Sequence, residues 1–234
     1  MMLEDIRKAV CAANQMLIQS GLVILTWGNV SAYDPASHLV VIKPSGISYE
    51  ELTPESMVIT DLCGNIVEGV YRPSSDTATH VEIYKNFPSI HSIVHTHSHW
   101  ATVWSQAGLD IPPLGTTHAD DFGASIPCTR ALTEQEITSA YETNTGKVIV
   151  ETLKKVDFSK CFAVLVREHG PFVWESSPEK AVEKAIVLEE VAHLAYDCKQ
   201  LRPDYAHMSP ALLKKHFERK HGKGAYYGQK VVED

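Results

Sequence analysis

The 234-residue sequence has no long hydrophobic run and no recognisable export signal. A helix needs roughly 18–20 consecutive apolar residues to cross a bilayer, and no stretch here reaches that length. The first residues, MMLEDIRKAV, lack the apolar segment that follows the basic start of a secretory signal. We therefore expect a cytoplasmic protein.

Cysteines are few and are not arranged in pairs. None of them forms a CxxC motif, and their number is odd, which argues against a disulfide framework and against a zinc site made of cysteines. This usage is typical of a reducing compartment. The five cysteines are Cys11, Cys63, Cys128, Cys161 and Cys198.

The sequence also lacks an excess of positive charge, because its formal net charge is −8 at pH 7. Proteins that bind nucleic acids or anionic membranes non-specifically usually carry a basic stripe, and we expect neither partner here. The segment KHFERKHGKG (215–224) is basic but short. An anionic small molecule would need a local pocket of hydrogen-bond donors rather than a global positive field.

The patterns that are present predict a single α/β domain with strands mainly in its first half and helices on either side. Because the strands do not alternate regularly with helices, we expect a three-layer arrangement rather than repeated βαβ units. Apolar spacing, alternation and Ser-Pro starts predict the helices, and β-branched runs predict the strands. The predicted helices cover 3–17, 77–86, 145–155, 177 to about 200 and 209–222. The predicted strands cover 22–33, 39–44, 56–60, 65–69, 92–98, 162–168 and 171–175.

The stretch IVHTHSHW (93–100) places histidines at every second position. In a strand, His95 and His97 would point to the same face and could bind one ion. A catalytic zinc ion usually takes three protein ligands and keeps one open position. Structural histidines held by hydrogen bonds are the alternative. His91 and His99 share the same parity, so the strand alone does not select the pair.

Other candidate ligands lie farther along the chain. His118 is in GTTHADDFG, and His169 precedes a Gly-Pro turn, where a side chain can point into a cleft. The alternative is a turn histidine that bonds the backbone. Asp76 can equally be the N-cap of the helix that follows it, and Asp120 and Asp121 can be ordinary loop carboxylates.

Three segments have the composition of an anion site: WGN (27–29), KPSG (43–46) and PSSD (73–76). Glycine lets backbone N–H groups approach a phosphate, and serine and asparagine add neutral donors. None of them matches a Walker loop or the GxGxxG fingerprint, so a nucleotide is not implied. Each segment alone is an ordinary turn, but their occurrence together with HxH is informative.

In combination, these motifs resemble the L-ribulose-5-phosphate 4-epimerases of the class II aldolase and adducin family. The resemblance extends in order over nearly the whole chain. It is carried by TWGNVSA, IKPSG, PSSDTATH, IVHTHS, GTTHAD, IPCTR, HGPF and RKHGKGAYYGQ. It implies one domain over residues 1–234, built as an α/β/α sandwich around a mainly antiparallel sheet. It also implies a homotetramer with active sites between subunits, a sugar-phosphate substrate and a divalent metal, most often Zn²⁺.

The resemblance also implies a role for individual residues. The metal ligands would be His95, His97 and His169, with Asp76 as an associated carboxylate. The acid–base pair would be Asp120 and Tyr227. The remaining substrate-binding positions would be Gly28, Asn29, Lys43, Ser45, Gly46, Ser74, Ser75 and His216. His91, His99 and His118 match no ligand position.

One residue departs from the family pattern, because Asp121 stands where relatives have an aromatic side chain. If the carboxylates of Asp120 and Asp121 were close and partly buried, their mutual repulsion would raise the pKa of one of them. The class of reaction would not change.

Two other functions share these motifs. A class II sugar-phosphate aldolase of the fuculose- or rhamnulose-phosphate type uses the same metal and phosphate pocket, but it has a glutamate near the position of Asp76. An inactive module like the adducin head would lack the histidine ligands. The aspartate and the ending AYYGQ favour an epimerase. Its pathway would be L-arabinose or L-ascorbate (or gulonate) degradation, and YRPSSDTATH slightly favours the latter.

Overall fold

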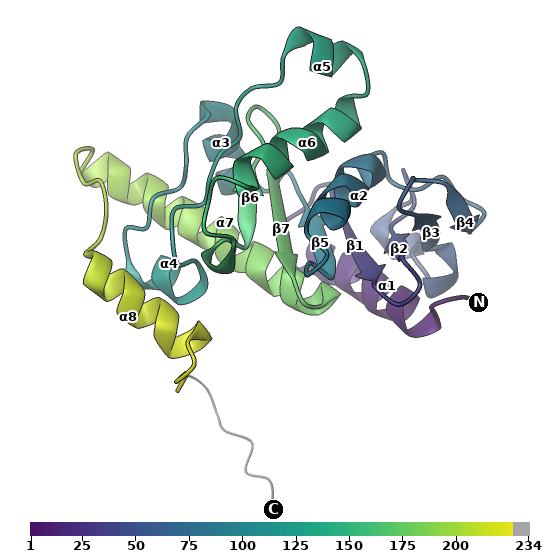
Figure 1. Cartoon of the computed structure of the whole chain (residues 1–234), viewed down its shortest axis with the longest axis horizontal. Helices are drawn as coiled ribbons and strands as arrows, with labels where there is room; N and C mark the ends of the chain where they lie inside the picture. Colours follow the sequence, from purple (N-terminus) through teal and green to yellow (C-terminus); the bar gives the residue numbers. More distant parts are fainter. Residues whose placement is uncertain (227–234) are drawn as a thin grey trace, which may run out of the picture.

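The computed structural model of the chain describes residues 1–226. At its centre is one sheet in the order β4-β3-β2-β1-β5-β7-β6, with every neighbouring pair of strands antiparallel (Figure 1). The strands are β1 (Asn29–Asp34), β2 (Leu39–Ile42), β3 (Val58–Asp61), β4 (Ile66–Glu68), β5 (Ser92–His95), β6 (Ala163–Leu165) and β7 (Pro171–Glu175). The antiparallel sheet confirms the predicted fold class.

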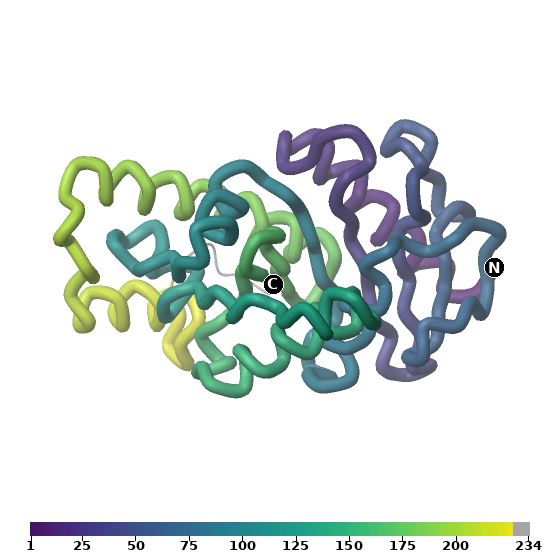
Figure 2. Tube along the Cα trace, turned by 90° about the horizontal axis from the view of Figure 1, so that it is seen from above, coloured from purple at the N-terminus to yellow at the C-terminus, as the bar shows by residue number. Residues whose placement is uncertain are grey.

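Helices cover both faces of this sheet, as the three-layer prediction requires (Figures 1 and 2). One layer contains α1 (Glu4–Gln19), α3 (His99–Ala107) and α7 (Pro178–Leu201), and the other contains α2 (Thr77–Asn86) and α6 (Tyr141–Leu153). Two hydrophobic cores result, one on each side of the sheet. No helix within residues 1–226 is both long and apolar enough to span a bilayer.

Three further α-helices complete the described chain, and all lie outside the central layers. They are α4 (Thr116–Asp121), α5 (Glu134–Thr138) and α8 (Pro210–His221). Short 3₁₀ turns cover Tyr49–Glu51, Pro54–Ser56 and Phe158–Lys160. In Figure 2, α4 and α8 lie at the end of the molecule opposite β3 and β4. The five cysteines are all free thiols.

Local sequence explains the start of α7. Ser177 accepts a hydrogen bond from the N–H of Lys180, and Pro178 occupies the first turn of α7, where proline loses no helix hydrogen bond. The start of α3 is different, because the carboxylate of Glu189 on α7 accepts hydrogen bonds from the N–H groups of Trp100 and Ala101. This cap comes from a distant residue, so the local pattern around α3 does not reveal it.

Most of the predicted strands are shorter in the structure than in the sequence pattern, and two of these differences lie at the site. Residues 22–28 form a loop rather than the first half of β1, because Leu25 and Gly28 have φ values of +54° and +80°, which interrupt an extended chain. A Cβ at Gly28 would lie 2.9 Å from the carbonyl oxygen of His95, so only glycine fits there. Strand β5 ends at His95, and the prediction that His97 lies on that strand is therefore wrong.

Candidate active site

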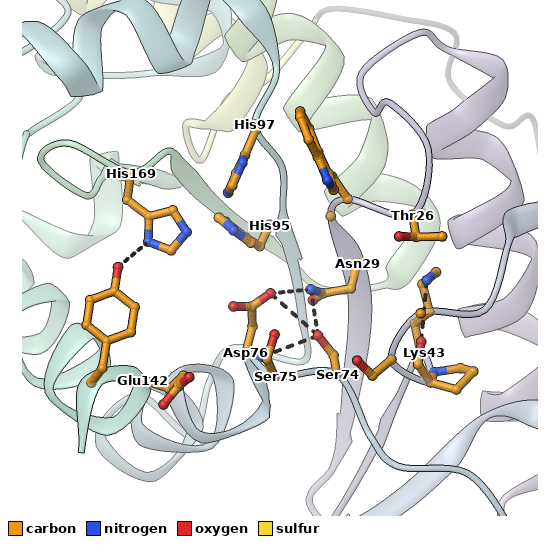
Figure 3. Close-up of a pocket in the computed structure, with 16 residues that line it drawn as sticks. Thr26, Asn29, Lys43, Ser74, Ser75, Asp76, His95, His97, Glu142 and His169 are labelled. Carbon is orange, nitrogen blue, oxygen red and sulfur yellow. Dashed lines mark hydrogen bonds between the residues drawn. The ribbon is translucent and has the colours of Figure 1, made fainter. Parts of the chain in front are cut away.

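Three imidazoles converge beside the end of β5. The ligand nitrogens of His95, His97 and His169 all lie within 4.8 Å of one another (Figure 3). His95 is the last residue of β5, and it pairs with Phe172 on β7. This pairing brings the turn before β7, which contains His169, next to the segment after β5. Sheet register therefore assembles the cluster from two distant segments.

Hydrogen bonds on Nδ1 leave Nε2 as the nitrogen that can bind an ion in two of these rings. The Nδ1–H of His95 donates to the carbonyl oxygen of Pro171 at 2.9 Å, and Nδ1 of His169 lies 3.4 Å from the hydroxyl of Tyr141. Burial lowers the pKa of His169 to about 3, so its ring is neutral at pH 7. Neutral imidazoles oriented through their second nitrogen are the donor set that a divalent transition metal prefers.

The turn that carries His169 is tightly constrained. Glu168 has φ +64°, an unusual conformation for a residue with a side chain, and its N–H donates to the carbonyl oxygen of Ser105. A Cβ on Gly170 would lie 2.6 Å from the carbonyl oxygen of Thr96. Backbone contacts on both sides therefore fix the position of His169.

A carboxylate lies next to the three imidazoles. Asp76 precedes α2 but makes no capping hydrogen bond with its side chain. Instead its Oδ2 accepts from Asn29 at 2.7 Å and from the hydroxyl of Ser74 at 3.5 Å. Burial acts to raise the pKa of Asp76, but the imidazoles of His95, His80 and His169 and the amide of Asn29 hold it below its usual value. Asp76 therefore occupies the N-cap position of α2, as the alternative interpretation expects, but its side chain does not cap the helix.

These groups line a cavity of about 400 Å³, in the size range of small-molecule sites. On the side away from the histidines, Lys43 is almost fully buried, and its Nζ donates to the carbonyl oxygen of Ile47 at 2.9 Å. Burial lowers the pKa of Lys43 to about 8. The buried Oδ1 of Asn29 has no hydrogen-bond partner within residues 1–226. The cavity wall thus contains the cation of Lys43 and a buried oxygen of Asn29 without a partner in the described chain.

The cavity brings together most of the residues singled out in the sequence. Those that line it are Gly28, Asn29, Lys43, Ser45, Gly46, Ser74, Ser75, Asp76, His95, His97 and His169. Figure 3 shows Lys43 and Ser74 on the side of Asp76 away from His97. Sequence reasoning missed three further lining residues, namely Thr26, Tyr141 and Glu142. Thr26 adjoins the predicted WGN segment, whose Trp27 also lines the cavity, whereas Tyr141 and Glu142 belong to no motif.

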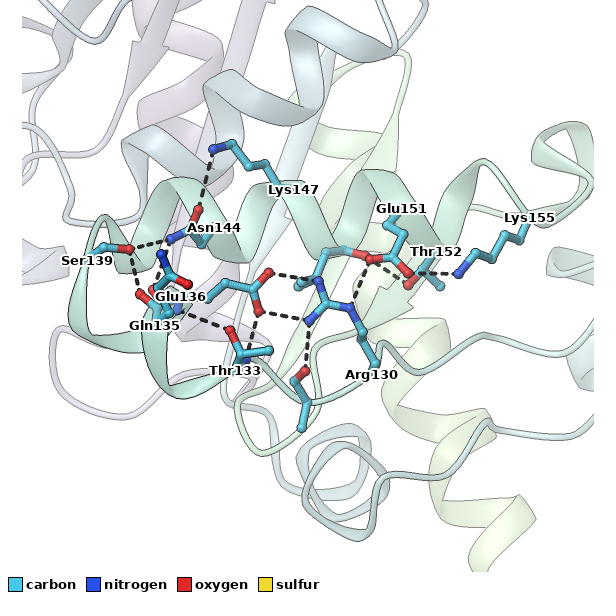
Figure 4. A network of polar contacts seen from close by, with 12 residues as sticks. Arg130, Thr133, Gln135, Glu136, Ser139, Asn144, Lys147, Glu151, Thr152 and Lys155 are labelled. Carbon is cyan, nitrogen blue, oxygen red and sulfur yellow. Dashed lines mark hydrogen bonds and ion pairs between the residues drawn. The ribbon is translucent and has the colours of Figure 1, made fainter.

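The start of α6, which supplies Tyr141 and Glu142, is held by a polar network (Figure 4). The guanidinium of Arg130 forms ion pairs with Glu136 on α5 at 2.8 Å and with Glu151 on α6 at 2.9 Å. Arg130 thus links the two helices on either side of the turn that enters the cavity wall.

Asp120 is not among the residues that line this cavity. It lies on α4 and faces α8, where Arg219 donates to its two carboxylate oxygens at 2.9 and 2.7 Å. The Nδ1–H of His216 donates to the same carboxylate at 3.0 Å. Partial burial acts to raise the pKa of Asp120, but the hydrogen bonds from Arg219 and His216 hold it below its usual value. Asp120 and His216 are therefore neighbours of each other, apart from the histidine cluster.

Asp121 has its own set of cations. Lys184 on α7 and Lys220 on α8 lie 2.8 and 3.0 Å from its carboxylate. Burial acts to raise the pKa of Asp121, but the hydrogen bonds and charges of these lysines hold it low. The expected rise of one aspartate pKa is wrong, because separate cations neutralise Asp120 and Asp121. Tyr227, the other predicted acid–base residue, lies outside the described residues.

The other histidines considered as ligands do not line the cavity. His91 and His99 are exposed. The Nε2–H of His118 donates to the carbonyl oxygen of Ala124 at 2.8 Å, beside the short helix α4. Among the residues described, only His95, His97 and His169 form a cluster with metal-binding spacing.

Comparison with known proteins agrees with this geometry. Residues 8–196 match the model of the Class II Aldolase and Adducin N-terminal domain. An L-fuculose 1-phosphate aldolase structure is 23% identical, with a TM-score of 0.77 over 92% of this chain and 95% of that one. YgbL, described as a putative aldolase/epimerase/decarboxylase from Klebsiella pneumoniae, is also 23% identical, with a TM-score of 0.71 over 92% and 99% of the two chains. The chain therefore belongs to the class II aldolase and adducin family, whose enzymes generally depend on a divalent metal.

Proposed function

We propose that this protein is a metal-dependent L-ribulose-5-phosphate 4-epimerase that uses Zn²⁺. The observation that carries the proposal is one cavity with three convergent imidazoles beside Asp76 and, beyond it, the buried cation of Lys43. Such a cavity can bind a short sugar by its oxygens at one end and by its phosphate at the other. The epimerase motifs PSSDTATH and AYYGQ support this reaction over others of the family.

The substrate explains why a carbon–carbon bond must break. The hydrogen on C4 of L-ribulose 5-phosphate is not next to the C2 carbonyl, so simple deprotonation is unfavourable. Retro-aldol cleavage of the C3–C4 bond gives an enediolate and glycolaldehyde phosphate. Rotation of the aldehyde and re-formation of the bond on its other face then give D-xylulose 5-phosphate, with no atom gained or lost.

The side chains of the cavity would divide this work. A divalent metal held by His95, His97 and His169 supplies Lewis-acid polarisation of the substrate oxygens when bound. The phosphate would lie by Lys43 and Ser75, and it must stay held so that the cleaved fragment does not leave.

Proton transfer at the C4 oxygen needs one group on each side, because that oxygen changes direction during the reaction. We assign these roles to Asp120 and Tyr227. Because Asp120 does not line the cavity of its own chain, the pair would come from an adjacent subunit of a homotetramer. Because its pKa is lowered, Asp120 would begin the reaction as a proton acceptor. His216 would hold its carboxylate in place through their hydrogen bond.

A sugar-phosphate aldolase is the second candidate, favoured by the similar fold of the L-fuculose 1-phosphate aldolase structures. Such an enzyme would release its two fragments. Asp76 has the shorter acidic side chain and lies beside the imidazoles, held by Asn29, which suits a metal-associated carboxylate better than a mobile acid–base. The intact imidazole cluster counts against an inactive interaction module.

Mixed tetramers test the assignment. His97→Ala would lose the metal site, and Tyr227→Phe would lose the proton carrier, so each variant should be inactive or nearly so. If each site combines His97 of one subunit with Tyr227 of another, co-refolding the two variants should restore about a quarter of the wild-type activity. No recovery in tetramers shown to be mixed would contradict a shared site. Unchanged rates of Tyr227→Phe in both directions would contradict the role of Tyr227.

A further inference from the structure

A fourth histidine lies close to the cavity but is completely enclosed. His80 is on α2 and has no exposed surface. Its Nε2 is buried and has no hydrogen-bond partner within the described residues 1–226. Leaving a buried polar atom without a partner costs on the order of 1–3 kcal/mol. A residue retained at that cost needs an explanation, and none of the roles assigned so far provides one.

The other ring nitrogen of His80 belongs to a short hydrogen-bonded chain. Nδ1 lies 2.7 Å from Oγ of Ser31, and the same Oγ lies 2.7 Å from the hydroxyl of Tyr84. Ser31 is fully buried and Tyr84 almost so. Three groups therefore share two hydrogen bonds away from water.

Counting protons determines the direction of this chain. If Tyr84 donates to Ser31 and Ser31 donates to Nδ1, both hydroxyl protons are used, and His80 carries its proton on Nε2. In the reverse direction, the hydroxyl proton of Tyr84 is left without an acceptor and Nε2 without a donor. The first arrangement leaves one unpaired group and the second leaves two, so the Nε2–H tautomer is favoured.

The contacts between α2 and β1 place the ring of His80 on the side of α2 that Asp76 also occupies. Asn29 and Ser31 lie on one face of β1, two residues apart. Asn29 bonds Asp76 and Ser31 bonds His80, and these two residues are one helical turn apart on α2, because the N–H of His80 donates to the carbonyl oxygen of Asp76. Side chains on a helix tilt toward its N-terminus, so the ring of His80 leans toward Asp76.

The charges agree with this arrangement. Burial lowers the pKa of His80 to about 3, although Asp76 acts to raise it. The ring is therefore neutral at pH 7, and it presents a polar N–H rather than a positive charge to the Asp76 side of α2. Within residues 1–226, the hydrogen bonds to the side chain of Asp76 all reach Oδ2, so Oδ1 can accept another.

We propose that His80 is a positioning residue: Tyr84 and Ser31 hold it as the Nε2–H tautomer, and the dipole of this N–H, one helical turn from Asp76 and not hydrogen-bonded to it in this structure, attracts the free Oδ1 and so favours the position of the Asp76 carboxylate beside the three ligand histidines. The effect on Asp76 rests on the proposed metal site, whereas the tautomer does not. Hydrogen-bond partners of metal-associated groups typically change metal affinity 10- to 100-fold when removed.

The first test uses the metal-free protein. In ¹⁵N spectra of the histidine rings, His80 should show a protonated Nε2 and an unprotonated Nδ1. Tyr84→Phe removes the donor that begins the chain, and the single tautomer should then give way to a mixture. A protonated Nδ1 in the wild type, or an unchanged tautomer in Tyr84→Phe, would overturn the proposal.

The second test measures Zn²⁺ affinity by calorimetry, with a competing chelator. His80→Phe keeps the size of the ring and should weaken Zn²⁺ binding 10- to 100-fold. The control is His118→Phe, which also alters a buried histidine with one unpaired nitrogen but lies on α4 rather than on the helix that follows Asp76, and it should bind Zn²⁺ like the wild type. Equal affinity of the two variants would overturn the role of His80. If the wild type binds no Zn²⁺, the proposed metal site fails, and the spectra still decide the tautomer.

Discussion

The Nδ1–H of His95 donates a hydrogen bond to the backbone carbonyl of Pro171 at 2.9 Å. This contact joins the end of β5 to the start of β7, and it leaves Nε2 of the ring as a lone pair directed at His97 and His169. A backbone carbonyl can only accept, so in the neutral ring the proton is held on Nδ1. The fold itself therefore prepares this imidazole to bind a cation.

Metal binding should stabilise the protein through this cluster. A ligand that binds only the folded state at 100 times its dissociation constant adds about 2.7 kcal/mol to the free energy of unfolding. We expect Zn²⁺ to raise the melting temperature of the chelator-treated wild type and of His99→Ala, which alters an exposed neighbour. His169→Ala should show little or no shift. A metal-dependent shift of equal size in all three proteins would place the ion elsewhere.

Gly170→Ala should impair the metal site specifically. The added Cβ would lie 2.6 Å from the carbonyl oxygen of Thr96, so the turn that carries His169 must move. We expect at least a tenfold loss of Zn²⁺ affinity, measured by chelator competition, because a metal site depends on the position of each ligand. Gly115→Ala, where a Cβ meets no atom within 4 Å, is the matched control. Wild-type affinity in Gly170→Ala would show that the turn tolerates the shift.

Substrate binding should depend on pH through Lys43. Burial lowers its pKa to about 8, so the ammonium form that attracts a phosphate is lost as the pH rises through 8. We expect KM to rise above that pH in the wild type. In Lys43→Met, kcat/KM should fall roughly 10- to 100-fold, the equivalent of a hydrogen bond to a charged group, and the rise of KM near pH 8 should disappear. Persistence of that rise in the variant would assign it to another group.

The buried ion pair between Asp121 and Lys184 should contribute to stability. Breaking such a pair leaves a buried charge and typically costs 3–5 kcal/mol; because Lys220 also pairs with Asp121, we expect about 3 kcal/mol for Lys184→Met in chemical denaturation. Asp121→Leu with Lys184→Met should lose less than the sum of the single changes. Additive losses would show that the pair is not coupled.

The same pair fixes the direction of a pH effect. The folded-state pKa of Asp121 lies below its ordinary value of 3.8, so its contribution is present above about pH 4 and is lost as the pH falls through the folded pKa. The stability difference between wild type and Asp121→Leu should therefore shrink in acid. A difference that grows below pH 4 would contradict this assignment.

Local patterns predicted the elements whose signals are local. The helix after Ser177-Pro178 and the strand at 171–175 lie where the sequence places them, because a cap or a run of apolar residues determines each. Helix α3 was not predicted, since the acceptor for its first N–H groups is Glu189, far along the chain. Strand β5 ends before His97. The predicted strand was too long, because the alternation of histidines in the sequence continues past the last paired residue.

The candidate site shows the same division. The resemblance of short motifs predicted the cavity residues from Gly28 to His169, and the structure places them together. Tyr141 and Glu142 could not be predicted, because only the packing of α6 brings them to the cavity. The salt bridges of Asp120 depend on how α8 lies against α4, and no spacing in the sequence encodes that contact.

The most direct test of the central claim is to incubate the Zn²⁺-loaded protein with L-ribulose 5-phosphate and to follow the products by ¹³C NMR. The proposed epimerase should convert the substrate to an equilibrium mixture with D-xylulose 5-phosphate, and His97→Ala should not. Free glycolaldehyde phosphate that accumulates in place of D-xylulose 5-phosphate, or no conversion by the metal-loaded protein, would contradict the proposal.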